Sequence, residues 1–103
     1  MTREITPIVY ILASQRNGTL YTGVTSDLVA RIHHHREGTF GGFTKQHHVN
    51  RLVWFEAHGT MENAIVREKR IKKWRRAWKL ELIEAENPRW LDLAEQFGFD
   101  RLS

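Results

Sequence analysis

The chain has no cysteine, only two prolines and no long apolar run among its 103 residues. Without cysteine it forms no disulfide and holds no metal through thiolates, which fits a cytoplasmic protein. No apolar run approaches the roughly 20 residues of a membrane-spanning helix, so we expect no membrane association. The N-terminal MTREITP also lacks the apolar stretch of a secretion signal. We therefore expect a cytoplasmic protein.

What is present is the composition of an ordinary globular protein. Hydrophobic residues make up 41% of the chain and charged residues 27%. A chain of this length has room for one modest hydrophobic core. We therefore expect residues 1–103 to form a single domain.

The positive charge is concentrated in one segment. Residues 67–79, REKRIKKWRRAWK, hold eight Lys or Arg and one Glu, whereas the rest of the chain holds eight basic and eleven acidic residues. Such a segment is either a solvated helix face or a surface for a polyanion. Trp74 and Trp78 lie among these cations, which suits nucleic acid, because cations meet phosphates and rings stack on bases. Packing into the core is the alternative for these tryptophans.

Residues 9–25, VYILASQRNGTLYTGVT, are typical of a β-hairpin. The Asn17-Gly18 pair predicts a two-residue turn, because both residues tolerate a positive φ. In that register Tyr21 faces Ser14, which lies four residues and roughly 13 Å from Tyr10 along the strands. The hairpin then has two faces, one with Val9, Ile11, Leu20 and Val24, the other with Tyr10, Leu12, Tyr21 and Gly23.

The remaining pattern predicts two main helices and a third strand. Apolar spacing and capping residues indicate a helix over residues 27–37, then a loop, then a strand over residues 51–57. A long helix begins near Met61 and ends in the mid-70s. Asn87-Pro88 resembles a helix start, followed by the short helix RWLDLAEQF. The order β-β-α-β-α with a terminal helix predicts a small α/β sandwich built on a three-stranded sheet.

Glu68 is an unusual residue on the apolar stripe of the long helix. It lies between Ala64 and Ile71, and a carboxylate buried without a partner is costly. One interpretation is an ion pair with a neighbouring cation at the rim of the core. The other is an oxygen ligand for Mg²⁺, whose sites often combine one or two carboxylates with phosphate and water.

Arg31 and His35 lie one helical turn apart beside the apolar residues of the first helix. The Arg31 guanidinium can hold a phosphate through two hydrogen bonds, or it can pair with Asp27. His35 is either a hydrogen-bonded structural residue or a general base near neutral pH. The run His33-His34-His35 suggests a zinc site, but adjacent helical residues point about 100° apart, which disfavours this interpretation.

Taken in order, these residues resemble the GIY-YIG nuclease domain. Its first motif is matched by Val9-Tyr10-Ile11 and its second by Tyr21-Thr22-Gly23, followed by Arg31, His35 and Glu68. Val9 replaces the first glycine, and Thr22 replaces the middle isoleucine. The resemblance covers a core of about residues 6–80, with a helical extension over 81–103, and is greatest to small excinuclease-subunit-C-like members. The family fold, a three-stranded antiparallel sheet flanked by helices, agrees with the predicted order of elements.

The resemblance implies a metal-dependent endonuclease that hydrolyses phosphodiester bonds in DNA. It implies a single divalent ion, Mg²⁺ or Mn²⁺, and a role in repair or recombination on branched or damaged DNA. By resemblance, Glu68 binds the metal and Arg31 holds the scissile phosphate. Tyr10 and Tyr21 activate or position the attacking water and orient the phosphate, and His35 assists proton transfer. A free tyrosine, with a pKa near 10, is a poor base and needs such help.

Substrate contacts are expected from a glycine and several cations. Gly23 would leave room for the substrate backbone, and the phosphates would meet Lys45, Arg70, Lys73 and Arg76. Two alternatives remain: a catalytically weak or inactive nucleic-acid-binding module that uses the basic helix 67–79, and a domain that binds an acidic protein. The nuclease is favoured because binding alone does not require Glu68, whose charge repels phosphate unless a metal lies between them.

Overall fold

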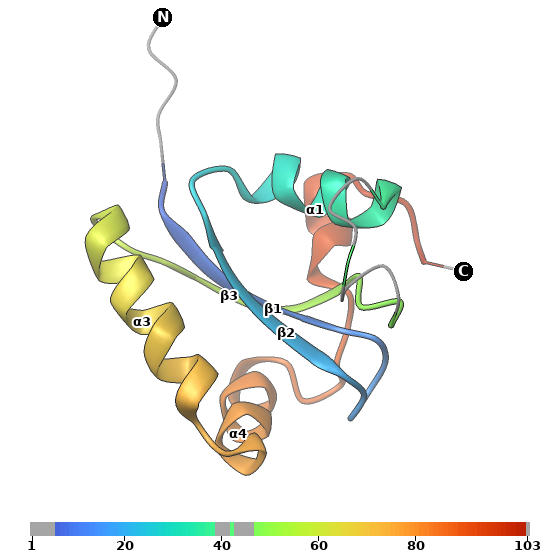
Figure 1. The fold of residues 1–103 in the computed structure, drawn as a ribbon. Helices are drawn as coiled ribbons and strands as arrows, with labels where there is room; N and C mark the ends of the chain where they lie inside the picture. The colour runs from blue at the N-terminus through green and yellow to red at the C-terminus, as the bar shows by residue number, and fades with distance from the viewer. Residues whose placement is uncertain (1–5, 39–41, 43–46, 103) are drawn as a thin grey trace, which may run out of the picture.

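The computed structural model describes residues 6–38, 42 and 47–102. Its centre is an antiparallel sheet of order β2-β1-β3, formed by β1 (Ile8–Ala13), β2 (Leu20–Thr25) and β3 (Arg51–Ala57). Helix α1 (Leu28–Glu37) and the short 3₁₀ helix η1 (Leu93–Phe97) cover one face (Figure 1). Helices α3 (Met61–Lys73) and α4 (Arg76–Glu86) cover the other. The predicted fold class is confirmed.

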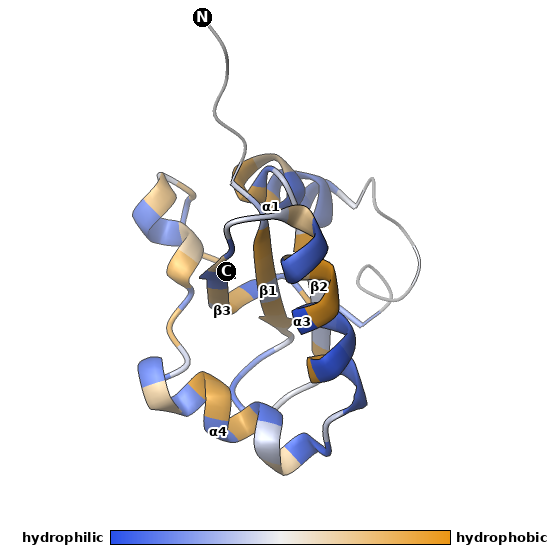
Figure 2. Cartoon of the chain, turned by 90° about the vertical axis from the view of Figure 1, so that its left-hand side faces the viewer, coloured by the Kyte–Doolittle hydropathy of each residue, from blue (hydrophilic) through white to orange (hydrophobic). Residues whose placement is uncertain are grey.

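The central strand β1 is buried on both faces. Val9, Ile11 and Ala13 pack toward α3 and α4, whereas Tyr10 and Leu12 pack toward α1 and η1. Two-sided burial explains why β1 is a continuous apolar run and not an alternating one. Figure 2 shows β1 as hydrophobic, while much of α3 is hydrophilic.

The hairpin register differs from the predicted one by two residues. Tyr21 pairs with Leu12 and not with Ser14, so the connection is a longer loop and the predicted two-residue turn is wrong. In this loop Ser14 N donates to the Thr19 carbonyl at 3.0 Å, and Asn17 is left-handed with φ 58°. Because a shift of two residues preserves side-chain alternation, the predicted division of the two faces is confirmed.

Helix α1 carries the predicted buried stripe. Leu28, Ile32 and His35 are its buried residues, spaced by one helical turn. Asp27 caps its N-terminus by accepting a hydrogen bond from the Ala30 N–H at 3.1 Å. Gly38, with φ 76°, ends the helix in the left-handed conformation.

Helix α3 ends in the mid-70s, as the sequence predicted, but helix α4 follows at once. Trp74 is extended, with φ −67° and ψ 148°, and α4 begins at Arg76. The sequence did not predict α4 as a separate helix over these residues. Arg76 donates to the carbonyls of Asn17 at 2.7 Å and Gly18 at 2.6 Å, so the first turn of α4 holds the hairpin tip.

Asn87 ends a helix and does not begin one. It is the C-cap of α4, which corrects the predicted Asn87-Pro88 helix start. Its side-chain amide donates to the carbonyls of Val53 at 3.1 Å and Leu91 at 2.9 Å, and its oxygen accepts from the Leu91 N–H at 3.0 Å. The predicted helix RWLDLAEQF is reduced to η1, because Trp90 is left-handed with φ 54°.

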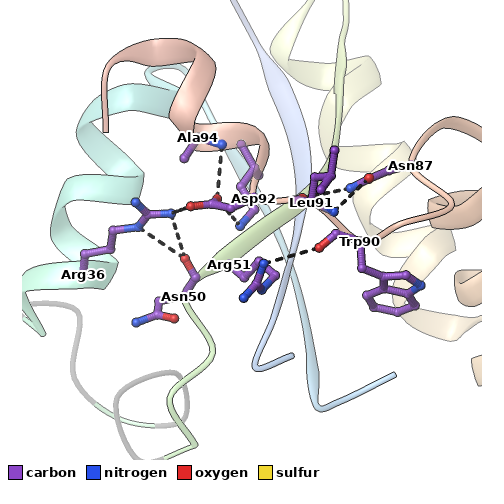
Figure 3. Close-up of polar contacts among 9 residues, drawn as sticks. Arg36, Asn50, Arg51, Asn87, Trp90, Leu91, Asp92 and Ala94 are labelled. Carbon is purple, nitrogen blue, oxygen red and sulfur yellow. Dashed lines mark hydrogen bonds and ion pairs between the residues drawn. The ribbon is translucent and has the colours of Figure 1, made fainter. Parts of the chain in front are cut away.

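Asp92 fastens the C-terminal segment to the sheet and to α1 (Figure 3). Its carboxylate accepts from the N–H groups of Leu52 and Ala94, both at 3.2 Å. It also pairs with Arg36 at 2.7 Å, and the Asp92 side chain is only 1% exposed. A buried carboxylate with three partners is well compensated, so this segment belongs to the folded core.

Candidate active site

Three rings predicted to belong to the site lie together on the α1 face of the sheet. The ring centroids of Tyr10 and Tyr21 are 6.3 Å apart, those of Tyr10 and His35 5.9 Å, and those of Tyr21 and His35 5.4 Å. Tyr10 Oη lies 3.0 Å from His35 Nε2, within hydrogen-bond distance. Tyr10 is 1% exposed and His35 5%, whereas Tyr21 is half-buried.

Gly23 is the residue that lets Tyr10 lie in this position. Gly23 pairs with Tyr10 across β1 and β2, and a Cβ on Gly23 would lie 2.5 Å from both Cζ and Oη of Tyr10. No carbon side chain fits at that distance, so the tyrosine ring occupies the space above the glycine. Tyr10 therefore fills the space on the side-chain side of Gly23, and a contact between Gly23 and the substrate stays a prediction.

The environment fixes the protonation of both partners in this hydrogen bond. Burial, followed by the charge of Tyr21, raises the pKa of Tyr10 well above its ordinary value; Glu68 acts in the same direction and Arg31 opposes it. Burial, then the charges of Arg31 and His34, lower the pKa of His35 to about 4. At neutral pH Tyr10 is therefore protonated and His35 neutral, and the tautomer of the His35 ring sets which of the two donates the hydrogen bond between Tyr10 Oη and His35 Nε2.

Arg31 and Glu68 bring opposite charges to this cluster from opposite sides of the sheet. Arg31 is half-buried on α1, one turn before His35, and Glu68 is buried on α3. Each charge shifts the pKa of Tyr10 in its own direction, as a nearby cation and anion should. The structure therefore groups the rings of Tyr10, Tyr21 and His35, and the charges of Arg31 and Glu68 act on the pKa of Tyr10 from α1 and α3.

Glu68 has an ion-pair partner that the sequence did not single out. Lys72 Nζ lies 3.1 Å from a Glu68 oxygen, with the lysine side chain 51% exposed and the glutamate 12%. The i, i+4 spacing on one helix was the available signal. Both interpretations of Glu68 remain compatible with this pair, because a half-exposed lysine can move aside when a ligand binds.

The described part of the chain contains no cluster of three His, Cys, Asp or Glu residues that could hold a metal ion. The zinc interpretation of the histidine run thus gains no support. Glu68 alone can supply one hard oxygen ligand at the rim of the core. A divalent ion there would take its other ligands from water and phosphate, as Mg²⁺ commonly does.

The predicted substrate-binding cations lie in different parts of the structure. Arg70 and Lys73 are exposed, but they lie about 200° and 140° around α3 from Glu68, so neither shares its face. Lys69, at about 100°, is closer to that face and was not predicted. Arg76 is bound to the hairpin tip, as described above. Lys45 lies outside the described residues.

Within residues 6–38, 42 and 47–102, no helix is long and apolar enough to cross a membrane. This agrees with the absence of a long apolar run in the sequence. The helices instead pack on the two faces of the sheet.

Comparison with known proteins places these observations in a family. Residues 6–81 match the family described as the GIY-YIG catalytic domain. A UPF0213 protein of Syntrophus aciditrophicus is 40% identical over 81 residues, covering 78% of this chain and 91% of the relative. UPF0213 proteins of Staphylococcus aureus are 38% identical over 76 residues, covering 74% of this chain and 92% of the relative.

A solved structure of the same kind shares the fold. The solution NMR structure of a UPF0213 protein from Bacillus halodurans matches 88% of this chain and 96% of its own, with a TM-score of 0.55 and 28% sequence identity. The sequence match spans both tyrosine motifs, the arginine of α1 and the glutamate of α3. This chain therefore belongs to the GIY-YIG catalytic domain family, together with its UPF0213 relatives.

Proposed function

We propose that this protein is a metal-dependent endonuclease that hydrolyses phosphodiester bonds in DNA. The observation that carries the proposal is the convergence at Tyr10 of two rings, Tyr21 and His35, and two opposite charges, Arg31 and Glu68. Hydrolysis of a phosphodiester needs charge neutralisation, a deprotonated water and alignment for in-line attack. An arginine, a metal-binding carboxylate and hydrogen-bonding rings together supply these requirements.

Arg31 and Glu68 divide the task of charge neutralisation. Arg31 is suited to hold the scissile phosphate, because its guanidinium can donate two parallel hydrogen bonds to phosphate oxygens. Glu68 would bind one divalent ion, Mg²⁺ or Mn²⁺, which when bound stabilises negative charge on the phosphate and lowers the pKa of water. Without such an ion the Glu68 carboxylate repels the phosphate, so a binding-only role leaves this residue unexplained.

Burial separates the roles of the two tyrosines. Tyr10 is buried and its hydroxyl is hydrogen-bonded to His35, so it is poorly placed to act as a base toward a water molecule from solvent. Tyr21 keeps accessible surface beside the same His35 ring. We assign to Tyr21 the contact with the attacking water or the phosphate. Tyr10 and His35 would support it as a hydrogen-bonded pair whose two rings lie against the Tyr21 ring and fix its position.

The proposal is tested by a cleavage assay on supercoiled plasmid and on branched DNA with Mg²⁺ or Mn²⁺, and with EDTA as a metal-free control. Glu68→Gln should reduce nicking to background, whereas the matched variant Glu62→Gln, on an exposed position of the same helix, should cut normally. Arg31→Ala should slow cleavage by about 100-fold or more, the usual effect of removing one charge-stabilising donor. Equal nicking by the wild type and Glu68→Gln would refute the assignment.

The tyrosine assignment has its own readout in the same assay. Tyr21→Phe should lower the cleavage rate while leaving stability nearly unchanged, because its side chain is only half-buried. Tyr10→Phe should cost stability as well, because it removes the hydrogen bond to His35. The assignment fails if Tyr21→Phe cuts at the wild-type rate.

A nucleic-acid-binding module without useful catalysis is the second candidate. The exposed cations Lys69, Arg70 and Lys73 on α3 favour it, because together they form a basic surface that needs no metal. DNA binding that weakens steeply with salt, without cleavage under any metal condition, would support this candidate over the nuclease.

A further inference from the structure

An apolar groove lies where α3 meets α4, apart from the cluster around Tyr10. It has a volume of about 370 Å³ and is lined by Trp74, Trp78, Glu81 and Leu82. Trp78 and Leu82 lie one turn apart on α4, and Trp74, the C-cap of α3, completes the lining from the other helix. Trp78 is 48% exposed, which is unusual for the largest apolar side chain on a small domain.

The two tryptophan rings are held in place by neighbouring arginines. Their centroids are 6.1 Å apart with an interplanar angle of 81°, an edge-to-face arrangement. The Arg75 guanidinium carbon lies 5.0 Å from the centre of the Trp78 ring, and that of Arg67 lies 5.3 Å from the Trp74 ring. Arg67 is itself fixed by Glu56, at 3.0 Å. Each tryptophan ring of the groove therefore lies against a guanidinium group.

The charges around the groove indicate which ligand it suits. Arg75 and Lys79 flank Trp78 in the sequence, within the segment 67–79 that carries eight basic residues and one acidic residue. Glu81 is the only acidic group in the lining, and it is exposed. The ionised carboxylates of an acidic peptide have no hydrogen to donate to Glu81. A nucleobase instead stacks on the rings, its phosphates meet the flanking cations, and a carboxylate accepts from an exocyclic amino group.

We propose that this groove binds an unpaired DNA base that carries an exocyclic amino group, with cytosine as the simplest case. This inference rests on the proposed function, because it takes DNA as the substrate. Trp74 follows Glu68 by six residues, so the groove begins about 9 Å from Glu68 along the axis of α3. A DNA strand that binds at Glu68 would thus have a neighbouring base within reach of the groove. The protein would thus favour DNA with a single-stranded branch or flap over uninterrupted duplex.

The test measures binding and leaves cleavage aside. Fluorescence anisotropy compares labelled oligo(dC), oligo(dT) and a duplex of equal length, in EDTA and at one fixed salt concentration. The wild type should bind oligo(dC) more tightly than oligo(dT), since both are flexible pyrimidines and only cytosine has the amino group. Trp78→Ala should weaken oligo(dC) binding about 5- to 150-fold, the range for losing one stacked base. Duplex binding should change by less than about twofold.

Two further variants and a control keep the result specific. Trp78→Phe should recover much of the affinity because it restores a ring, and Glu81→Ala should remove the preference for oligo(dC) over oligo(dT). Phe97→Ala, which truncates an aromatic residue that is 40% exposed outside the groove, should bind like the wild type. Retention of wild-type oligo(dC) affinity by Trp78→Ala would overturn the proposal.

Two other outcomes, self-association of the protein and the absence of cleavage, bear on the proposed groove in different ways. Self-association of the wild type that Trp78→Ala abolishes would assign the groove to a second copy of the chain and overturn the proposal. Failure of the nuclease is a separate result. A protein that never cuts DNA, but loses oligo(dC) binding with Trp78→Ala, would refute the endonuclease and support the base-binding groove.

Discussion

Replacing Gly23 by alanine tests whether this glycine exists to admit the Tyr10 ring. The added Cβ would lie 2.5 Å from Cζ and Oη of Tyr10 and 2.9 Å from Cε1. These contacts must lengthen to at least 3.4 Å, the start of ordinary van der Waals separation. Tyr10 is 1% exposed in the core, so its ring cannot move without displacing its neighbours and weakening the bond to His35.

The expected cost follows from three contributions. Overpacking a core by one methyl group costs about 1–3 kcal/mol. Weakening the Tyr10–His35 hydrogen bond costs about 1 kcal/mol more. Alanine also lowers the conformational entropy of the unfolded chain, which stabilises the folded protein by about 0.4–1 kcal/mol. We therefore expect Gly23→Ala to lower the free energy of unfolding by about 1–3.5 kcal/mol.

Urea unfolding provides the measurement, with an unchanged m-value as the sign that only stability has shifted. Gly59→Ala is the matched control, because a Cβ at Gly59 meets no atom within 4 Å. That variant should be neutral or slightly more stable. In a Tyr10→Ala background the penalty of Gly23→Ala should disappear, since the two residues interact directly. An equal effect of alanine at positions 23 and 59 would refute the reasoning.

Two other predictions concern the buried polar groups. His35 binds a proton in the folded protein only below about pH 4, but the unfolded chain binds it below its ordinary pKa of 6.5. The free energy of unfolding should therefore fall as pH is lowered through this interval, and His35→Gln should flatten that fall in urea titrations; identical pH slopes would contradict a neutral buried His35. Asp92→Ala should cost about 3 kcal/mol by stranding Arg36 and two backbone N–H groups. Asp100→Ala, at an exposed position, should change urea stability by less than about 0.5 kcal/mol, and equal losses in the two variants would contradict this account.

The alternation of side chains was predictable, but the hairpin register was not. Side-chain alternation depends only on position along a strand, so Tyr10 and Tyr21 could be placed on one face from the sequence. The register depends on how the loop closes. The Asn17-Gly18 pair fits a two-residue turn, yet only Asn17 adopts a positive φ. The loop is closed instead by bonds between Ser14 and Thr19, including one from the Thr19 N–H to the Ser14 hydroxyl at 2.9 Å.

The end of α3 in the mid-70s was predicted, but the immediate start of a separate helix α4 was not. Positions 74 and 75 are occupied by tryptophan and arginine, and not by glycine or proline, the residues that usually mark a turn. The local sequence therefore gives no reason for a second helix to begin there. The contacts that accompany the turn come from distant parts of the chain: Trp74 packs against the core, and Arg76 binds the hairpin tip. Asn87 is a similar case, because its bond to the Val53 carbonyl of β3 depends on tertiary structure.

The sequence was enough to select the residues of the candidate site, but not to predict how they contact one another. Tyr10, Tyr21 and His35 could be selected because their types and order resemble a known motif, and the structure groups their rings. The role of Gly23 required the pairing of Gly23 with Tyr10, which the predicted register missed. The neutral state of His35 likewise required its burial, which no sequence pattern specifies in degree.

Some residues of the proposed active site also pack in the core. A variant therefore reports on catalysis alone only where its residue is not needed for the fold. Tyr10 belongs to the central strand, paired on both sides, and its hydroxyl is part of the buried network, so any change there disturbs fold and site together. Arg31 and Tyr21 lie at the margin of the same cluster and keep contact with solvent. A loss of cleavage with unchanged urea stability at these two positions would therefore separate catalysis from folding, which no substitution of Tyr10 can do.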